Sequence, residues 1–273
     1  MEEKILGDII TKIREKQPIV FHITNMVTIN DCANITLALG ASPLMSFCEE
    51  ELEDILSFSS ALILNIGTMD KDMRKMVVKA GEIANKLGKP VILDPVGAGA
   101  SKARMDLVGK LIKNVKFAVI KGNMAEIKSI AGIRNKNNRG VDSVEELEDA
   151  DEIALDLANK LETVIALTGK QDVVTDGKRI SRISNGTPIL GKVTGTGCMT
   201  ASLIGSACGV EKDYFIGATV GVSIMGISGE IAQSKLKEGQ GSSTLRIGII
   251  DSVYNMTSEI FKTKAKIELN KAN

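Results

Sequence analysis

The sequence is poor in aromatic residues: it has no tryptophan, 2 tyrosines and 6 phenylalanines in 273 residues. Proteins that bind single-stranded nucleic acid stack bases on aromatic side chains, so this shortage argues against such a surface. Lysine plus arginine and aspartate plus glutamate are balanced at 34 each, which gives a formal net charge of zero. No global charge attracts the chain to nucleic acid or to an anionic membrane, and we expect neither as a partner.

Cysteine is also scarce, at 4 residues: Cys32, Cys48, Cys198 and Cys208. No two of them have the C-x-x-C spacing of a zinc or redox site, and they are too few for a disulfide framework. The N-terminal residues run directly into an amphipathic segment and do not form a signal-peptide pattern. We therefore expect reduced thiols and a cytoplasmic protein.

Uncharged runs long enough to span a bilayer are absent. The two longest cover residues 193–210 and 214–229, which is short of the ~20 residues that a membrane span requires. Both runs contain many glycines and small polar residues. We interpret them as buried helices.

Short apolar segments alternate with helical patterns along most of the chain. Unbroken apolar runs of this length are typical of strands buried on both faces, and the helical spacing between them predicts crossover helices. We therefore predict an α/β fold with a mostly parallel central sheet and helices on both faces. Asn30 or Asp31 is expected to cap the helix after the first strand. The predicted strands are residues 19–23, 61–65, 91–93, 117–120 and 164–167.

The later part of the chain adds antiparallel structure. Residues 173–175 and 179–183 flank an Asp-Gly turn and are predicted as a β-hairpin, so the sheet is mixed. The polar residues 134–140 are expected to form a loop, and the polar C-terminal residues 262–273 to fray or to end a helix. No shift in composition and no repeat marks a boundary, so we expect a single domain over residues 1–273.

A turn of glycine and threonine, residues 194–198, leads into the uncharged segment 199–208. Glycine lets several N–H groups converge at a helix start, where they are unsatisfied and the helix dipole is positive. We expect an anion-binding site there, with Cys198 more acidic than the usual ~8.5 of a thiol. An ordinary loop before a packed helix, with Cys198 as a small buried side chain, explains the same residues.

Two other phosphate-binding motifs are missing. The sequence has no G-x-x-x-x-G-K-[ST], so it is not a P-loop enzyme. The turn at residues 195–200 lacks the third glycine of the dinucleotide fingerprint, and it lies late in the chain. Any nucleotide must therefore be bound in another way.

Polar residues follow the ends of the predicted strands, which is where open α/β sheets bind ligands. Carboxylates that hold Mg²⁺, a cation and free N–H groups are what phosphoryl transfer needs. Each of these residues also has an interpretation as an ordinary turn or surface residue. The single histidine, His22, is expected to support packing rather than catalysis. The strand-end residues are Asn25, Gly67, Thr68, Asp94, Lys121, Glu126, Thr168 and Gly169.

A set of short motifs, taken in order, makes the chain resemble the hydroxyethylthiazole kinases, thiamine-salvage enzymes of the ribokinase-like superfamily. Each motif alone is weak, but the ordered set is specific and covers nearly the whole chain. The resemblance implies a ribokinase-like fold. The motifs occupy residues 23–27, 30–31, 40–45, 65–68, 93–98, 121–123, 166–169 and 195–198.

The resemblance implies ATP-dependent phosphorylation of the primary alcohol of 4-methyl-5-(2-hydroxyethyl)thiazole, with Mg²⁺ as cofactor. It also implies a homotrimer with active sites between subunits. Three alternatives remain open: a kinase for a hydroxymethylpyrimidine or a sugar, an ATP-dependent dehydratase of hydrated nicotinamide cofactors, and a binding protein without turnover. Met45 argues against a sugar, whose pocket needs many polar partners. The dehydratases are expected to have an aspartate where Cys198 stands.

The resemblance also implies a role for individual residues. Relatives often have arginine at the position of Lys121. Arginine would bind a phosphate group through two parallel hydrogen bonds, whereas lysine offers a single point charge. Cys198, where the wider superfamily has an aspartate base, is expected to position or deprotonate the alcohol without being indispensable, because positioning and electrostatics dominate phosphoryl transfer. The implied roles are substrate binding for Asn25, Met45, Gly67 and Gly195, ATP or anion binding for Lys121, Thr168, Thr194, Gly195, Thr196 and Gly197, magnesium binding for Asp94 and Glu126, and catalysis for Cys198.

Overall fold

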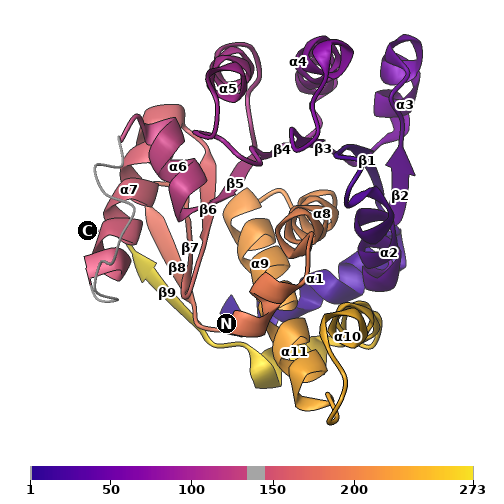
Figure 1. Cartoon of the computed structure of the whole chain (residues 1–273), viewed down its shortest axis with the longest axis vertical. Coiled ribbons are helices and arrows are strands. Elements are labelled where there is room, and N and C mark those ends of the chain that lie inside the picture. The colour runs from indigo at the N-terminus through magenta and orange to yellow at the C-terminus, as the bar shows by residue number, and fades with distance from the viewer. Residues whose placement is uncertain (1, 134–144, 273) are drawn as a thin grey trace.

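A nine-stranded mixed sheet runs through the described part of the chain (Figure 1). The computed structural model describes residues 2–133 and 145–272, so the loop expected over residues 134–140 lies outside it. The strand order is β2-β1-β3-β4-β5-β6-β7-β8-β9. The strands are β1 (Ile19–Ile23), β2 (Ser42–Met45), β3 (Ala61–Asn65), β4 (Val91–Asp94), β5 (Val119–Asn123), β6 (Val164–Thr168), β7 (Asp172–Thr175), β8 (Arg179–Ile183) and β9 (Ile267–Lys271).

The first six strands pair in parallel, and β7, β8 and β9 continue the sheet antiparallel. Every residue of β3 and β4 is buried, as their unbroken apolar sequences predict for strands covered on both sides. The predicted parallel strands and the predicted hairpin are confirmed. All carboxyl ends of the parallel strands therefore lie at one edge of the sheet.

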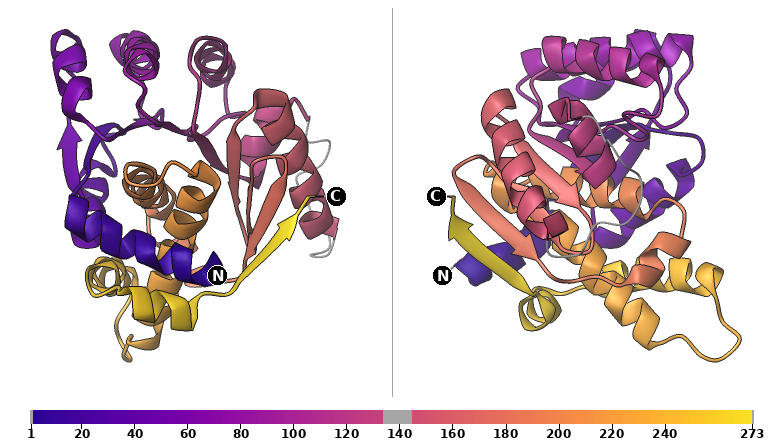
Figure 2. Two further views of the ribbon diagram at one scale, coloured as in Figure 1. Left: turned by 180° about the vertical axis from the view of Figure 1, so that it is seen from behind. Right: turned by 60° about the vertical axis from the view of Figure 1, so that its left-hand side comes forward.

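Helices cover both faces of the sheet, as predicted, and Figure 2 shows the two helix layers from behind and from the side. One layer contains α3 (Leu52–Phe58), α4 (Lys71–Lys86), α5 (Lys102–Asn114), α6 (Met124–Ala131) and α7 (Glu145–Leu161). The other contains α1 (Glu2–Lys16), α2 (Ile29–Leu39), α8 (Thr196–Cys208), α9 (Tyr214–Ser234), α10 (Ser242–Tyr254) and α11 (Ser258–Lys264). Short 3₁₀ turns, η1 (Glu49–Glu51) and η2 (Pro188–Lys192), lie in the connections.

The sheet separates two apolar cores, and successive residues of one strand alternate between them. In β3, Ala61 and Ile63 belong to the core beneath α8 and α9, whereas Leu62 and Leu64 belong to the core beneath α4 and α5. This alternation follows from the period of two along a strand. It fixes which side chains reach α8, the helix that begins at the carboxyl edge.

Helices α8 and α9 form from the two uncharged runs and are buried in the protein, as predicted. Within the described residues, α9 is long and apolar enough to cross a membrane by length and composition, but 83% of its most apolar window is buried. Burial of this extent is typical of a core helix. Both helices pack in contact with the sheet and with each other.

One local expectation is confirmed only in part, and another is wrong. Residues 262–264 end helix α11, as expected, but Ile267–Lys271 form β9, which pairs antiparallel with β8, because Ile267 and Leu269 recur with a period of two and pack against the core. At the start of α2, Thr28 occupies the N-cap position without a side-chain cap. Asp31 instead accepts a hydrogen bond from Arg246 Nε of α10 over 2.7 Å. A tertiary ion pair thus replaces the expected local cap.

Candidate active site

Polar side chains gather at the carboxyl edge of the parallel strands, in otherwise apolar surroundings. Asn65 and Asp94 are paired in register at the ends of β3 and β4. Asn25 follows β1, and Lys121 is the middle residue of β5. None of these four side chains belongs to a residue that is more than 4% exposed. Buried polar groups need partners, and here they find them in one another and in the start of α8.

Two side-chain amides converge on the sulfur of Cys198. Asn25 Nδ2 lies 3.3 Å and Asn65 Nδ2 lies 3.2 Å from Cys198 Sγ. Asn65 Oδ1 accepts hydrogen bonds from Asn25 Nδ2 (3.0 Å) and from the backbone N–H of Gly67 (2.9 Å). Because its oxygen accepts these two hydrogen bonds, the amide of Asn65 directs its N–H groups toward Asp94 and Cys198. Asn65 belongs to one of the family motifs but was not predicted to have a role; its place at the end of a buried strand was the available signal.

Asp94 links this group to Lys121. Its Oδ2 accepts a hydrogen bond from Asn65 Nδ2 over 2.6 Å, and its Oδ1 lies 3.4 Å from Lys121 Nζ. Burial opposes the charged form of Lys121, but the carboxylates of Asp94 and Glu126 outweigh it and raise the pKa of the lysine. The ammonium therefore stays charged. A Cβ on Gly197 would lie 2.9 Å from Nζ, so this ammonium sits against the first turn of α8.

The acidity expected for Cys198 is wrong. Burial, followed by the nearby Asp94 carboxylate, raises the pKa of the Cys198 thiol above its ordinary value. Thr28, Lys121 and Asn65 act in the opposite direction without reversing the shift. The helix start and the amides are thus outweighed by removal of the thiol from water and by a neighbouring negative charge. At neutral pH the sulfur is a neutral thiol in the free protein.

Glu126 lies in the first turn of α6 and ties two loops together. Its Oε2 accepts a hydrogen bond from the N–H of Asn123, which forms a capping box, and its Oε1 accepts one from the N–H of Gly97 (2.9 Å each). Each carboxylate oxygen keeps a further lone pair. Among the described residues, no group of three or more His, Cys, Asp or Glu could hold a metal. A cation here would take most of its ligands from water or substrate, as Mg²⁺ commonly does.

The predicted anion turn has the expected backbone form. Gly195 precedes α8 with φ of 93°, a left-handed conformation that favours glycine, and a Cβ there would lie 2.7 Å from Thr28 Cγ2. No side chain caps α8, so its first N–H groups have no side-chain acceptor. Thr194 is exposed and precedes this turn.

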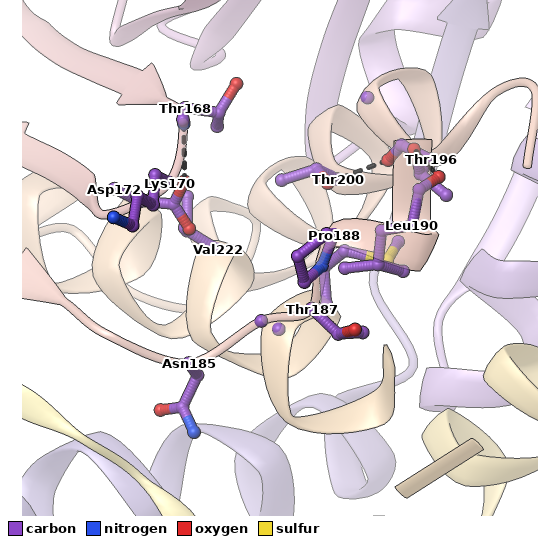
Figure 3. A pocket seen from close by; sticks show the side chains of 15 residues that line it. Thr168, Lys170, Asp172, Asn185, Thr187, Pro188, Leu190, Thr196, Thr200 and Val222 are labelled. Carbon is purple, nitrogen blue, oxygen red and sulfur yellow. Dashed lines mark hydrogen bonds between the residues drawn. The ribbon is translucent and has the colours of Figure 1, made fainter. Parts of the chain in front are cut away.

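A cavity of about 560 Å³ opens beside this helix start (Figure 3). Thr168, Lys170 and Asp172 lie on one side of it, and Thr196 and Thr200 on the other. Three residues predicted to bind ATP or an anion thus share one cavity: Thr168, Thr196 and Gly197. Gly169, expected among the strand-end residues, also lines the cavity. The lining residues that were not expected from the sequence are Lys170, Asp172, Asn185, Gly186, Thr187, Pro188, Leu190, Thr200, Val222, Met225 and Gly226.

Asp172 is the least expected of these residues. Its Oδ1 accepts a hydrogen bond from the N–H of Gly169 over 2.8 Å, which shapes the turn after Thr168. Burial raises the pKa of Asp172 to about 7, although Gly169 and the charge of Lys121 oppose the shift. Its position between the Thr-Gly turn and the predicted hairpin was visible in the sequence, but nothing there indicated that it faces a cavity.

The residues predicted to bind the substrate, Asn25, Met45, Gly67 and Gly195, do not line this cavity. Gly67 packs against Asn25, because a Cβ at Gly67 would lie 2.7 Å from that of Asn25. Met45 ends the edge strand β2, half-buried and in register with His22 of β1. His22 is fully buried, with Nδ1 2.9 Å from the carbonyl oxygen of Val20. As expected, it supports packing.

The sequence model of the hydroxyethylthiazole kinase family matches residues 10–259. The chain is 49% identical over 257 residues to the hydroxyethylthiazole kinase of Thermoanaerobacter pseudethanolicus, covering 94% of this chain and 96% of the relative. It is 46% identical over 261 residues to the enzyme of the same name from Clostridioides difficile, covering 96% and 98%.

Solved structures similar to this chain agree with the family match. The hydroxyethylthiazole kinase protein from Pyrococcus horikoshii superposes with a TM-score of 0.89 at 37% identity, covering 98% of this chain and 99% of that one. Pyridoxal kinase from Staphylococcus aureus, in complex with AMP-PCP and pyridoxal, gives 0.66 at 14% identity, covering 93% and 99%, which shows the fold alone. The predicted ribokinase-like fold is confirmed. By family match, relatives and fold, the chain is a member of the hydroxyethylthiazole kinase family.

Proposed function

We propose that this enzyme of the kinase class transfers the γ-phosphoryl group of ATP to the primary alcohol of 4-methyl-5-(2-hydroxyethyl)thiazole. One observation carries the proposal. Cys198 and the amides of Asn25 and Asn65 form a buried group at the uncapped start of α8, and Thr196, Gly197 and Thr200 of the same helix start line the 560 Å³ cavity. An alcohol bound at the first and a triphosphate bound in the second would meet at the N–H groups of Thr196 and Gly197.

The nucleotide occupies the cavity in this proposal. Thr168 lies across the cavity from Thr196 (Figure 3), and Gly169 and Gly197 also line it, so that hydroxyl and backbone N–H donors would be offered to a phosphate from both sides. Lys121 supplies a buried positive charge directly behind Gly197. Donors and a cation fixed in this way stabilise the charge on a transferring phosphoryl group without having to reorganise.

The alcohol side has Cys198 at its centre. The hydroxyl of the thiazole would lie next to Sγ, and Asn25 and Asn65 would stabilise negative charge that develops on sulfur or oxygen. The raised pKa of Cys198 makes the neutral thiol the resting form. We therefore assign Cys198 to positioning the hydroxyl, with proton acceptance as a contribution that grows at alkaline pH.

We assign Asp94 and Glu126 to a magnesium ion that accompanies the nucleotide. Both carboxylates are buried near the ammonium of Lys121, and each oxygen keeps lone pairs beyond its hydrogen bond. When bound, the ion neutralises phosphate charge. The protein's own part is to hold the two carboxylates at fixed positions, through Asn65 for Asp94 and through Gly97 and Asn123 for Glu126.

We further propose a homotrimer in which a neighbouring subunit covers the alcohol side, and a cytoplasmic location that keeps Cys198 reduced. Met26 and Val27, directly after Asn25, are 69% and 65% exposed, and Phe47, two residues after Met45, is 44% exposed. Exposed apolar side chains next in sequence to residues assigned to the substrate are what a neighbouring subunit would cover. Light scattering gives the assembly mass: a mass of three chains supports this part, and a monomer contradicts it.

The test of the reaction is product formation. The purified chain is incubated with ATP, Mg²⁺ and the thiazole alcohol, and the mass of the thiazole is measured. A product heavier by one phosphoryl group, formed only with Mg²⁺ present, supports the proposal. ADP release with a hydrated nicotinamide but no thiazole phosphate would overturn the reaction and keep the fold.

A further inference from the structure

A single guanidinium at the start of α5 binds the backbone of two different loops. Arg104 Nη1 lies 2.6 Å from the carbonyl oxygens of both Ile66 and Val96, and its Nη2 donates to the carbonyl oxygen of Gly67. The side chain is half-buried. All three acceptors are main-chain groups, so the contact depends on where the two loops run and not on their side chains.

These two loops present the reacting groups. Ile66 and Gly67 directly follow Asn65 at the end of β3, and Val96 lies two residues after Asp94 at the end of β4. Gly97 has φ of 73°, and a Cβ there would lie 3.2 Å from Arg104 Nε. The second loop therefore lies flat against the guanidinium. Arg104 thus connects the loops that follow β3 and β4, just beyond their last paired residues, Asn65 and Asp94.

In each loop, one further hydrogen bond connects the backbone held by Arg104 to a side chain of the site. The N–H of Gly67 donates to Asn65 Oδ1, which fixes the direction of the amide that faces Asp94 and Cys198. The N–H of Gly97 donates to Glu126 Oε1. The Ile66–Gly67 and Val96–Gly97 peptide groups therefore accept from Arg104 through their carbonyls and orient Asn65 and Glu126 through their N–H groups.

We infer that Arg104 is a positioning residue, whose guanidinium clamps the loops after β3 and β4 so that Asn65, Asp94 and Glu126 keep their orientations around Cys198. The inference rests on the proposed phosphoryl transfer. Arginine suits this task because its planar fork offers five donors in fixed directions, whereas lysine offers one compact charge. A loop shift of the order of 1 Å at a site of this kind lowers the rate by about 100-fold.

The test compares Arg104→Ala and Arg104→Lys with the wild type. Arg14→Ala is the matched control, because Arg14 also donates to a backbone carbonyl, that of Tyr254, over 2.6 Å, but lies on α1. We expect kcat for thiazole phosphorylation to fall by about 100-fold in Arg104→Ala and by about tenfold or more in Arg104→Lys. Millimolar methylguanidinium restores part of kcat in Arg104→Ala, whereas methylammonium does not. Arg14→Ala keeps the wild-type kcat.

Hydrogen–deuterium exchange gives a second readout that needs no substrate. In Arg104→Ala the peptides that contain residues 65–68 and 94–99 should exchange faster, while the peptides of β6 and α9 keep their rates. Methylguanidinium should slow the first two again. Unchanged exchange and unchanged kcat in Arg104→Ala would overturn the inference. An inactive wild type that still shows the loop effect would overturn the proposed reaction instead, and would leave the clamp in place.

Discussion

The side-chain amide of Asn65 donates to Cys198 Sγ over 3.2 Å, from the end of β3 to the first turn of α8. The same Nδ2 donates to Asp94 Oδ2 over 2.6 Å. One neutral residue therefore lies between a buried carboxylate and a thiol whose pKa that carboxylate raises. The amide separates the two groups and offers both of them a donor, which makes its chemical identity important for the site.

Replacing Asn65 by aspartate tests this arrangement at constant volume. The variant loses the N–H donors and places a second carboxylate beside Asp94, so we expect kcat to fall by about 10- to 100-fold. This range corresponds to the ~1.5–3 kcal/mol of a hydrogen bond to a charged group. Steady-state kinetics measures the change, with Asn114→Asp on the exposed end of α5 as control. Equal losses in both variants would show that Asn65 has no special role.

The pH dependence of kcat tests the role of Cys198. Because burial and Asp94 raise the pKa of the thiol above its ordinary value, the thiolate fraction is still rising at pH 9, and the wild-type rate should increase with pH up to and beyond that point. Cys198→Ala and Cys198→Ser should lack this increase and be about 100-fold slower at pH 9, the lower end of what a general base contributes. If both variants keep the wild-type activity and its alkaline increase, Cys198 does not accept the proton.

Gly197→Ala tests the position of Lys121. The added Cβ would lie 2.9 Å from Lys121 Nζ, so the ammonium must move away from α8 and from its contact with Asp94. We expect KM for ATP to rise roughly tenfold, equivalent to about 1.5 kcal/mol for one charge-assisted hydrogen bond, with KM for the thiazole nearly unchanged. The control is Gly109→Ala on α5, where a Cβ meets nothing within 4 Å. A rise confined to KM for the thiazole would contradict the assignment of Lys121 to the nucleotide.

His22 makes the folded protein sensitive to acid. Burial lowers its pKa from 6.5 to about 4, and hydrogen bonds to the backbone of Val20 in β1 and Leu44 in β2 oppose this shift without reversing it. The unfolded chain therefore takes up a proton between pH 6.5 and 4 that the folded protein excludes, so stability falls as the pH falls through this range. The histidine accounts for about 3 kcal/mol of the loss, from 1.4 kcal/mol for each pKa unit.

Urea unfolding at pH 7 and pH 4 measures this contribution, with His22→Asn as the comparison because its amide keeps a donor toward Val20. The wild type should lose more stability than the variant between the two pH values. Since the sequence has 1 histidine, its imidazole NMR signal is assigned without further work and gives the folded pKa directly. An ordinary pKa near 6.5 would contradict the buried, neutral state.

Most of the fold was predictable because strand and helix signals in this sequence are strong and local. The unbroken run Ala61–Asn65 forms β3, and the helical spacing between this run and the next predicted strand forms α4 (Lys71–Lys86), as expected. The failures depend on contacts that are distant in the sequence. Ile267 and Leu269 become a strand only because β8 lies beside them, and Asp31 leaves its expected cap for Arg246, 215 residues away.

The site was predictable to the level of which residues follow strand ends, since parallel strands bring those ends together. The geometry among them was not. The direction of the Asn65 amide depends on the N–H of Gly67, and the pKa of Cys198 depends on its burial beside Asp94. A sequence motif records neither the direction of an amide nor the loss of water around a thiol.

The central claim is the identity of the alcohol, and the most direct measurement is kcat/KM for competing alcohols under the same Mg²⁺ and ATP concentrations. The wild-type chain is assayed with 4-methyl-5-(2-hydroxyethyl)thiazole, a hydroxymethylpyrimidine and pyridoxal. We predict that the thiazole is preferred by about 100-fold or more, within the range that pocket contacts achieve. A preference for pyridoxal or for the pyrimidine would contradict the account of the substrate side.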